Sequence, residues 1–216
     1  MTPSTSPLLV LGTRTLAVEI ADIAADVPGV QVAGFVENLN PELCQEKLEN
    51  LPVLWVGAMA PLAQSHSAIC GLATTHRSRF VEQVAAYGIP FATIIHPSAR
   101  ISSKSAVGEG TLLSVGVIVA AHTHLSRHVL VNRGALIGHH TEIGDYVSIQ
   151  PGANIAGACR IGEATYIGMG AIVIDHITIG AHSVIGAGAV VTTDVPDHVL
   201  VTGVPARIVK ENIAGK

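Results

Sequence analysis

The chain has few aromatic and few charged residues, and no run of basic ones. Phe, Trp and Tyr make up 3% of its 216 residues, Asp, Glu, Lys and Arg 13%, and the net charge is −4. Without a basic cluster or an aromatic platform for stacked bases, we expect no nucleic-acid or membrane partner. The N-terminal segment lacks a basic region and its apolar run is only a few residues long, so neither a signal peptide nor a membrane span is expected.

Cysteine is scarce as well. Cys44, Cys70 and Cys159 show no paired spacing, which favours a reducing, cytoplasmic location. Cys159 falls at a small-residue position of the repeat described next, so we interpret it as a core residue rather than a nucleophile.

A strict period of six dominates the second half of the chain. Ile, Leu or Val stands at every sixth position from Ile101 to Val191 without a break, and a small or β-branched residue stands four residues after each. Gly often follows the aliphatic residue directly, as Gly138 and Gly162 do. A coil of three short, flat faces joined by tight turns needs such a period, so the sequence predicts a hexapeptide β-helix of about five coils over residues 98–198.

The first part of the chain follows a different pattern. Strand-like apolar segments occur at residues 8–12, 30–36, 51–57 and 91–96, and a further apolar stretch at 67–73. Helical spacing occurs at 15–25 and at 75–87, the latter with Thr74 or Thr75 as its cap. Strands that alternate with helices predict a small, Rossmann-like parallel α/β domain at 1–97, which leaves 199–216 as a C-terminal tail.

This α/β leader, the repeat and the ending Gly203-Val204-Pro205-Ala206-Arg207 together resemble the NeuD/PglD-like sugar acetyltransferases, a group of hexapeptide-repeat acyltransferases. The resemblance implies a left-handed β-helix, a homotrimer, acetyl-CoA as donor and no metal. It implies N-acetylation of an amino sugar, often nucleotide-linked, that binds to the α/β domain. O-acetylation of a free sugar acid such as sialic acid is the alternative.

His139 is the candidate general base. It lies two residues after an inward-facing aliphatic residue, at a turn where this family has its catalytic histidine, and a neutral imidazole suits that role. The family often has an acidic residue next, whereas this chain has His140, which accepts a hydrogen bond but brings no negative charge. Glu142 is near in sequence.

The resemblance also implies the binding residues. The acetyl-CoA contacts correspond to Ser148, Gly157, Met169 and Ala187, and Arg207 is a candidate for a CoA phosphate. The acceptor site corresponds to Gly12, Thr13, Arg14, Glu37 and Asn38.

The turn after the first strand departs from the family's Gly-rich pattern. Only Gly12 remains, because Thr15, Leu16 and Ala17 replace two glycines and a histidine. No G-x-G-x-x-G motif is present, so dinucleotide binding is not expected. We expect nucleotide sugars to bind weakly or in an unusual way, or the acceptor to carry no nucleotide.

Two lower alternatives stay open. His122 and His140 are three hexapeptides apart and should lie on adjacent coils, with His176 two coils further on and His182 one hexapeptide beyond it. Hexapeptide-fold carbonic anhydrases bind zinc through three histidines from two subunits, so a zinc hydratase is one alternative. A non-catalytic, ligand-binding relative is the other. An exposed column of histidines is the ordinary explanation of this spacing.

Overall fold

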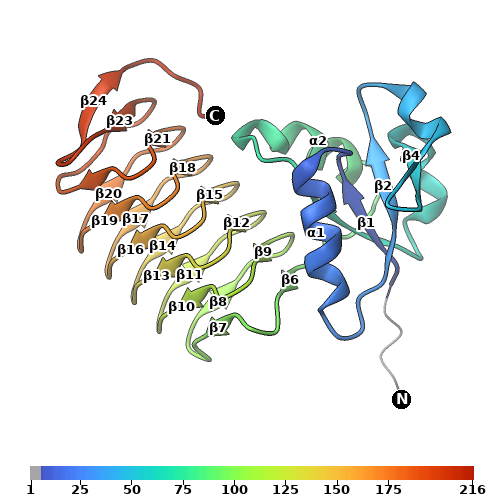
Figure 1. Ribbon diagram of the computed structural model, residues 1–216, viewed down its shortest axis with the longest axis horizontal. Helices are drawn as coiled ribbons and strands as arrows, with labels where there is room; N and C mark the ends of the chain where they lie inside the picture. The colour runs from blue at the N-terminus through green and yellow to red at the C-terminus, as the bar shows by residue number, and fades with distance from the viewer. Residues whose placement is uncertain (1–5) are drawn as a thin grey trace. The chain divides into compact units, whose positions relative to one another are not determined.

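A computed structural model describes residues 6–216, which form two units (Figure 1). The first unit comprises the described residues up to Ala73 together with Arg77–His96, and the second comprises Thr74–His76 and Pro97–Lys216. Among the described residues, no helix is both long and apolar enough to cross a membrane.

The N-terminal unit is built on a five-stranded sheet with the order β3-β4-β2-β1-β5. Its strands are β1 (Leu8–Leu11), β2 (Val32–Glu37), β3 (Lys47–Leu48), β4 (Leu51–Trp55) and β5 (Ser67–Cys70). All neighbours are parallel except β3 and β4, which form an antiparallel hairpin. The helices are α1 (Thr15–Ala25) and α2 (Ser78–Ala85), and 3₁₀ turns occupy Pro41–Gln45, Val56–Ala58, Ala60–Leu62 and Thr75–Arg77. The predicted small parallel α/β fold is confirmed.

Two predicted elements of this part were wrong in detail. The helix expected at 75–87 begins only at Ser78, because the Thr75 hydroxyl bonds to the main chain of Lys216 instead of capping α2. The strand expected at 91–96 shrinks to β6 (Ile94–Ile95), which lies in the eight-stranded sheet of the coil and not in the N-terminal sheet. Only a single bridge, from Phe91 to Ala68, joins this segment to β5.

The second unit is a coil with three sheets of short strands, which are parallel except for the last strand, as is typical of a left-handed β-helix; Figure 1 shows its rungs in chain order. The six-stranded face contains β7 (Arg100–Ile101), β10 (Ile118–Val119), β13 (Leu136–Ile137), β16 (Asn154–Ile155), β19 (Ile172–Val173) and β22 (Val190–Val191). The five-stranded face contains β8 (Ala106–Val107), β11 (His124–Leu125), β14 (Glu142–Ile143), β17 (Arg160–Ile161) and β20 (Thr178–Ile179).

The eight-stranded face contains β6 and then β9 (Leu112–Leu113), β12 (Leu130–Val131), β15 (Ser148–Ile149), β18 (Tyr166–Ile167), β21 (Val184–Ile185), β23 (Leu200–Thr202) and β24 (Arg207–Lys210). Segment 199–216 thus adds β23 parallel to β21, and β24 returns antiparallel to β23.

The aliphatic series forms the core of the coil, as the period predicts. From Leu113 to Val191 each member is at most 3% exposed, and only Ile101 and Val107 in the first coil are half-buried. Each strand pairs with the strand three hexapeptides further along the chain, as Ile137 does with Val119 and Ile155. Each coil therefore stacks on the next through identical positions, and its interior is one apolar column.

The turns of the coil contain two positions where glycine is frequent, and the sequence pattern did not distinguish their purposes. The left-handed backbone conformation occurs three residues after the aliphatic residue, where Gly or His is frequent; Gly134 has φ 66° and His140 φ 55°. The glycine directly after the aliphatic residue has another purpose. A Cβ on Gly138 would lie 2.5 Å from the amide nitrogen of Gly157 in the next coil, so this glycine lets two coils approach.

Candidate active site

His139 lies on one edge of the coil, which we call the histidine edge: the turns that follow the strands of the six-stranded face, at 102–105, 120–123, 138–141, 156–159 and 174–177. His122, His140 and His176 occupy the left-handed position of their turns on this edge, with φ between 55° and 61°. Histidine tolerates this conformation better than most side chains.

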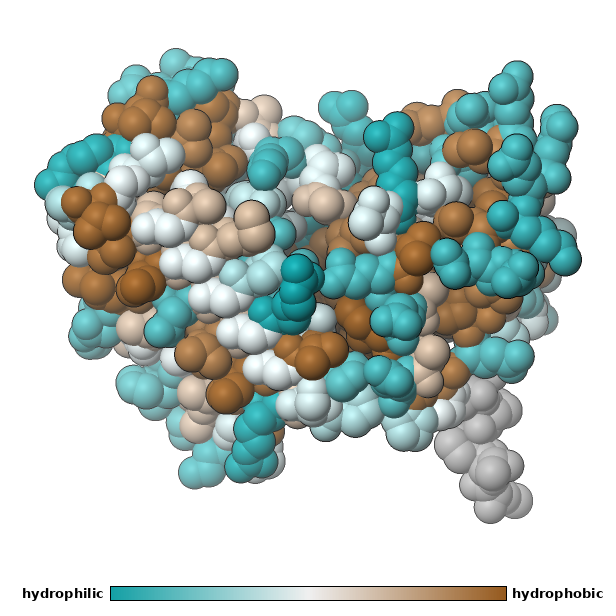
Figure 2. All heavy atoms as spheres, in the orientation of Figure 1, coloured by the Kyte–Doolittle hydropathy of each residue, from teal (hydrophilic) through white to brown (hydrophobic). Residues whose placement is uncertain are grey.

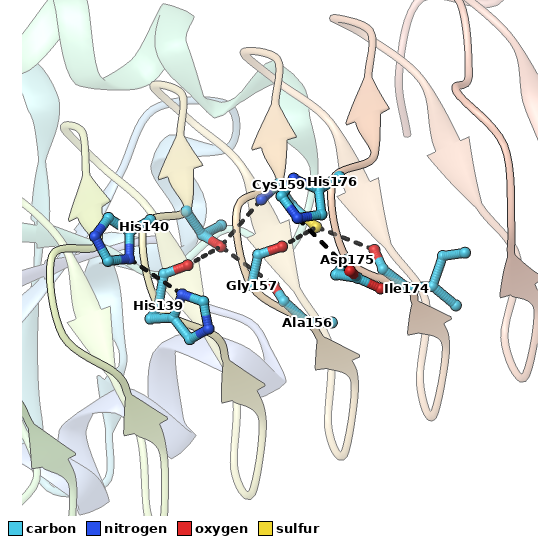
Figure 3. A network of polar contacts seen from close by, with 9 residues as sticks. His139, His140, Ala156, Gly157, Cys159, Ile174, Asp175 and His176 are labelled. Carbon is cyan, nitrogen blue, oxygen red and sulfur yellow. Dashed lines mark hydrogen bonds and ion pairs between the residues drawn. The ribbon is translucent and has the colours of Figure 1, made fainter.

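The His139 imidazole has one hydrogen-bond partner among residues 6–216. Its Nδ1 lies 3.1 Å from Nδ1 of His140, and the two rings meet edge to face (Figure 3). No carboxylate of the described residues forms an ion pair with either ring. The His139 side chain is exposed, so its Nε2 atom is left for an external partner.

Gly157 stands at the position equivalent to His139 on the next coil of the same edge. A Cβ on Gly157 would lie 2.6 Å from Cε1, 2.8 Å from Nε2 and 3.0 Å from Nδ1 of His139, so the imidazole lies over this glycine. Among the described residues, the Gly157 N–H has no acceptor, although its carbonyl accepts from the His176 N–H. The resemblance selected Gly157 as a contact of acetyl-CoA; the structure shows that the absence of a side chain there leaves room for the His139 ring.

Polar side chains inside the coil tie the histidine edge together. The Thr123 hydroxyl donates to the Gly138 carbonyl at 2.7 Å, and the Thr141 hydroxyl donates to the Ala156 carbonyl at 3.2 Å. The Cys159 thiol continues the series toward the Ile174 carbonyl at 3.2 Å (Figure 3). Burial raises the pKa of this thiol, in keeping with a core residue. The turn that presents His139 is therefore anchored from both neighbouring coils.

The expected CoA contacts are divided between edges. Met169 and Ala187 are exposed on the glycine edge, the turns at 114–117, 132–135, 150–153, 168–171 and 186–189 that precede strands of the six-stranded face. Within one chain this is not the edge of His139, although both edges border the same face. Ser148 is 0% exposed, which does not support its expected contact with CoA, because its side chain is buried on the eight-stranded face.

Arg207 lies in β24, beside a cavity of about 440 Å³ at the C-terminal part of the coil. Its guanidinium donates to the Ala206 carbonyl at 2.8 Å. Asp194 lines the same cavity, so a phosphate bound there would meet a carboxylate as well as an arginine.

Glu37, expected to touch the acceptor, organises the N-terminal unit from within. It is 7% exposed; Oε2 accepts from the Thr13 hydroxyl at 2.6 Å, and Oε1 accepts from the backbone N–H groups of Asn38, Leu39 and Asn40. Burial acts to raise the pKa of Glu37, but these hydrogen bonds outweigh it and hold the pKa below its usual value. The carboxylate thus joins the ends of β1 and β2.

The other expected acceptor residues surround this junction. Gly12 has φ 106°, which a side chain would strain, and Arg14 is exposed in front of α1 with no capping hydrogen bond. The Asn38 amide donates to Gln83 at 3.1 Å. Thr13 lines a cavity of about 80 Å³ with Leu43, Glu46, Lys47, Leu48 and Val53. This volume is below that of a usual small-molecule pocket.

Residues 158–193 match a family model described as bacterial transferase hexapeptide (six repeats). This part of the coil carries the repeat of bacterial hexapeptide transferases.

Solved structures match the chain over both units. PerB from Caulobacter crescentus, in complex with CoA and GDP-perosamine, is 29% identical over 94% of this chain and 97% of PerB, with a TM-score of 0.87. The acetyltransferase domain of PglB from Neisseria gonorrhoeae FA1090, in complex with acetyl coenzyme A, is also 29% identical, over 94% and 99% of the two chains, with a TM-score of 0.87. WeeI from Acinetobacter baumannii AYE is 25% identical over 94% and 99%, with a TM-score of 0.84. No curated protein sequence matches the chain.

The histidines of the coil do not form a metal site within residues 6–216. His122 and His140 do stack on adjacent coils, with ring centroids 4.8 Å apart. His176 is separated from them by Ala158, and His182 lies on a different edge, paired with Glu163 at 3.5 Å. Within the described chain, no group of three His, Cys, Asp or Glu side chains could hold a metal ion.

Proposed function

We propose that this chain is an acetyl-CoA-dependent N-acetyltransferase of a nucleotide-linked amino sugar. The observation that carries the proposal is the arrangement at the histidine edge, where His140 holds Nδ1 of His139 and leaves Nε2 to a reacting amine. The likeness to PerB, known with CoA and GDP-perosamine, supports the acceptor class. That perosamine N-acetyltransferase is also known with one histidine replaced by asparagine or alanine.

The chemistry is direct transfer in a ternary complex. The acceptor amine attacks the thioester carbonyl, Nε2 of His139 takes the proton that the amine loses, and the C–S bond breaks as the tetrahedral intermediate collapses. The imidazolium then returns the proton to the CoA sulfur, so that the products are an amide and a thiol. The unpaired N–H of Gly157, beside the imidazole, is our candidate donor to the oxyanion.

A homotrimer is part of this proposal. The six-stranded face and its two edges expose large apolar side chains: Val115, Ile118, Leu136, Met169, Ile172 and Ile174. Figure 2 shows brown, hydrophobic groups among pale, small residues over the coil. A second copy on this face would cover them and bring its own glycine edge to His139, which joins Met169 and Ala187 to the base.

The oligomer is tested by light scattering on the purified chain and on Ile172→Glu. We expect a trimer that the substitution dissociates, with loss of transfer. A monomeric wild-type chain that still transfers acetyl groups contradicts the assembly.

The small volume of the cavity beside Thr13 favours a second candidate for the acceptor. The Thr13–Glu37 hydrogen bond occupies the junction to which the acceptor site of the resembling family corresponds. O-acetylation of a free sugar acid is therefore the alternative. A cytoplasmic location accords with both and with the free thiols Cys44, Cys70 and Cys159.

The experiment is a thiol-release assay with acetyl-CoA and two acceptor panels: UDP-, GDP- and dTDP-linked amino sugars, and free sugar acids. We expect turnover with a nucleotide-linked amino sugar and a loss of about 10²–10⁴-fold in kcat for His139→Ala. Turnover with sugar acids alone would favour the alternative, and an active His139→Ala would refute the base. Calorimetry with Arg14→Ala and Asn38→Ala then tests whether the N-terminal unit holds the nucleotide.

A further inference from the structure

A third imidazole adjoins the pair at the candidate active site. His122, on the preceding coil, stacks on His140 with ring centroids 4.8 Å apart and 30° between the ring planes. Both residues adopt the left-handed conformation, with φ 61° and 55°, at equivalent positions of adjacent coils. The three rings therefore run in series from His122 through His140 to His139, which lies over Gly157.

The Nδ1–Nδ1 contact between His139 and His140 carries one proton, because two lone pairs would repel and two N–H groups would clash. If His139 donates, its Nε2 is free to act as a base and His140 carries its own proton on Nε2. If His140 donates, the proton of His139 moves to Nε2 and the base is blocked. Catalysis thus requires that His140 be held as the acceptor.

We propose that His122 is a positioning residue for the acetyl transfer. By stacking on the His140 ring, it holds that ring in the orientation in which His140 accepts a hydrogen bond from His139. The inference rests on the proposed function. His140, held in this orientation, then stands where the NeuD/PglD-like family often has an acidic residue. The His140 ring is exposed and has no other hydrogen-bond partner among the described residues, so the stack is the contact that fixes it.

The charged and titratable groups around this series are few. On the same edge they are Lys104, which lies one full coil before His122, the buried Cys159, and the pair Asp175 and His176, whose side chains are 3.7 Å apart. On the adjoining five-stranded face, His124 and Glu142 are cross-strand partners, and neither forms an ion pair with the three rings. Within residues 6–216, none of these groups forms a hydrogen bond or an ion pair with the His139 or His140 ring.

The test is a double-mutant cycle on kcat. His122→Ala is expected to lower kcat by about 3–10-fold with unchanged KM for acetyl-CoA, and to have no further effect in a His140→Ala background. His122→Phe, which keeps a flat ring without nitrogen atoms, is expected to restore kcat to within twofold. His176→Ala, at the equivalent position three coils after His122, is the matched control and should leave kcat unchanged.

Two results overturn the inference: an equal loss from His122→Ala with and without His140, or a loss that phenylalanine does not restore. An activity-independent measurement separates this from a failure of the proposed function. Imidazole ¹⁵N shifts should show His139 protonated on Nδ1 and His140 on Nε2 near pH 7.5, and both tautomers of each ring in His122→Ala. The reverse tautomers in the wild-type chain refute the series even if no acceptor is found.

Discussion

Substituting Gly157 with alanine separates the position of the base from the stability of the coil. The backbone of Gly157 is outside the left-handed region, so alanine fits its conformation. The new Cβ would lie 2.6–3.0 Å from three atoms of the His139 ring. An ordinary carbon contact is about 3.5–4.0 Å, so the ring must move by about 1 Å.

A displacement of about 1 Å in a catalytic group lowers the rate about 10²-fold, which is the loss of kcat we expect for Gly157→Ala. The ring is exposed and at the end of a flexible side chain, so the free energy of unfolding should change by about 0.5 kcal/mol or less. Thiol release measures the first quantity and thermal unfolding the second.

Gly138→Ala is the contrasting variant. Its Cβ would lie 2.5 Å from the Gly157 nitrogen and 2.6 Å from the Ala156 carbonyl oxygen. Backbone cannot swing aside, so this change should destabilise the protein by about 1–3 kcal/mol. A Gly157→Ala protein that keeps kcat within threefold, while His139→Ala is inactive, would refute the idea that the ring must lie where the structure has it. A Gly157→Ala protein that is as unstable as Gly138→Ala would refute the expectation that only the His139 ring moves.

Three further predictions concern the donor site and the N-terminal unit. Ala187→Trp should raise the KM for acetyl-CoA in a folded protein, and unchanged donor kinetics would place CoA elsewhere. Gly71→Ala should destabilise by about 1–3 kcal/mol, because its Cβ would lie 2.9 Å from that of Ala17 and 3.0 Å from the Leu11 carbonyl oxygen, and Ala17→Gly should restore part of that loss if the α1 contact matters. The lowered pKa of Glu37 means that its carboxylate stabilises the folded state above its ordinary pKa of 4.5, and that this stability is lost as the pH falls through the lower folded pKa. Thermal unfolding of Glu37→Gln should therefore show a deficit at pH 7 that narrows below about pH 4.5, and a pH-independent deficit would argue against the charge.

The family's second and third loop glycines illustrate how a sequence departure can be compensated. Ala17 stands where the resembling family has a glycine, and a Cβ there would be expected to separate α1 from the sheet. In this chain Gly71, at the end of β5, lacks the atom that would meet Ala17. The close approach of α1 to the sheet in this chain therefore depends on the absence of a side chain at Gly71.

The sequence alone determined the coil, its aliphatic core and the turn that carries His139. Each depends on a period of six, and in a stacked coil that period is local: a residue's face follows from its position in its own hexapeptide. The alternation of strand-like and helical segments likewise predicted the parallel sheet of the N-terminal unit.

Only the tertiary structure decided what these residues touch. That His139 lies over Gly157, that His122 stacks on His140, and that Glu37 bonds to Thr13 depend on the register between segments and on side-chain direction. The spacing of one full coil predicted that His122 and His140 lie on adjacent coils, yet it could not say that their rings stack. For Glu37 nothing in the sequence indicated its partner, because a glutamate that binds a ligand and one that bonds to its own loop look the same in a sequence. Only the burial of Glu37 and its hydrogen-bond partners distinguish the two roles.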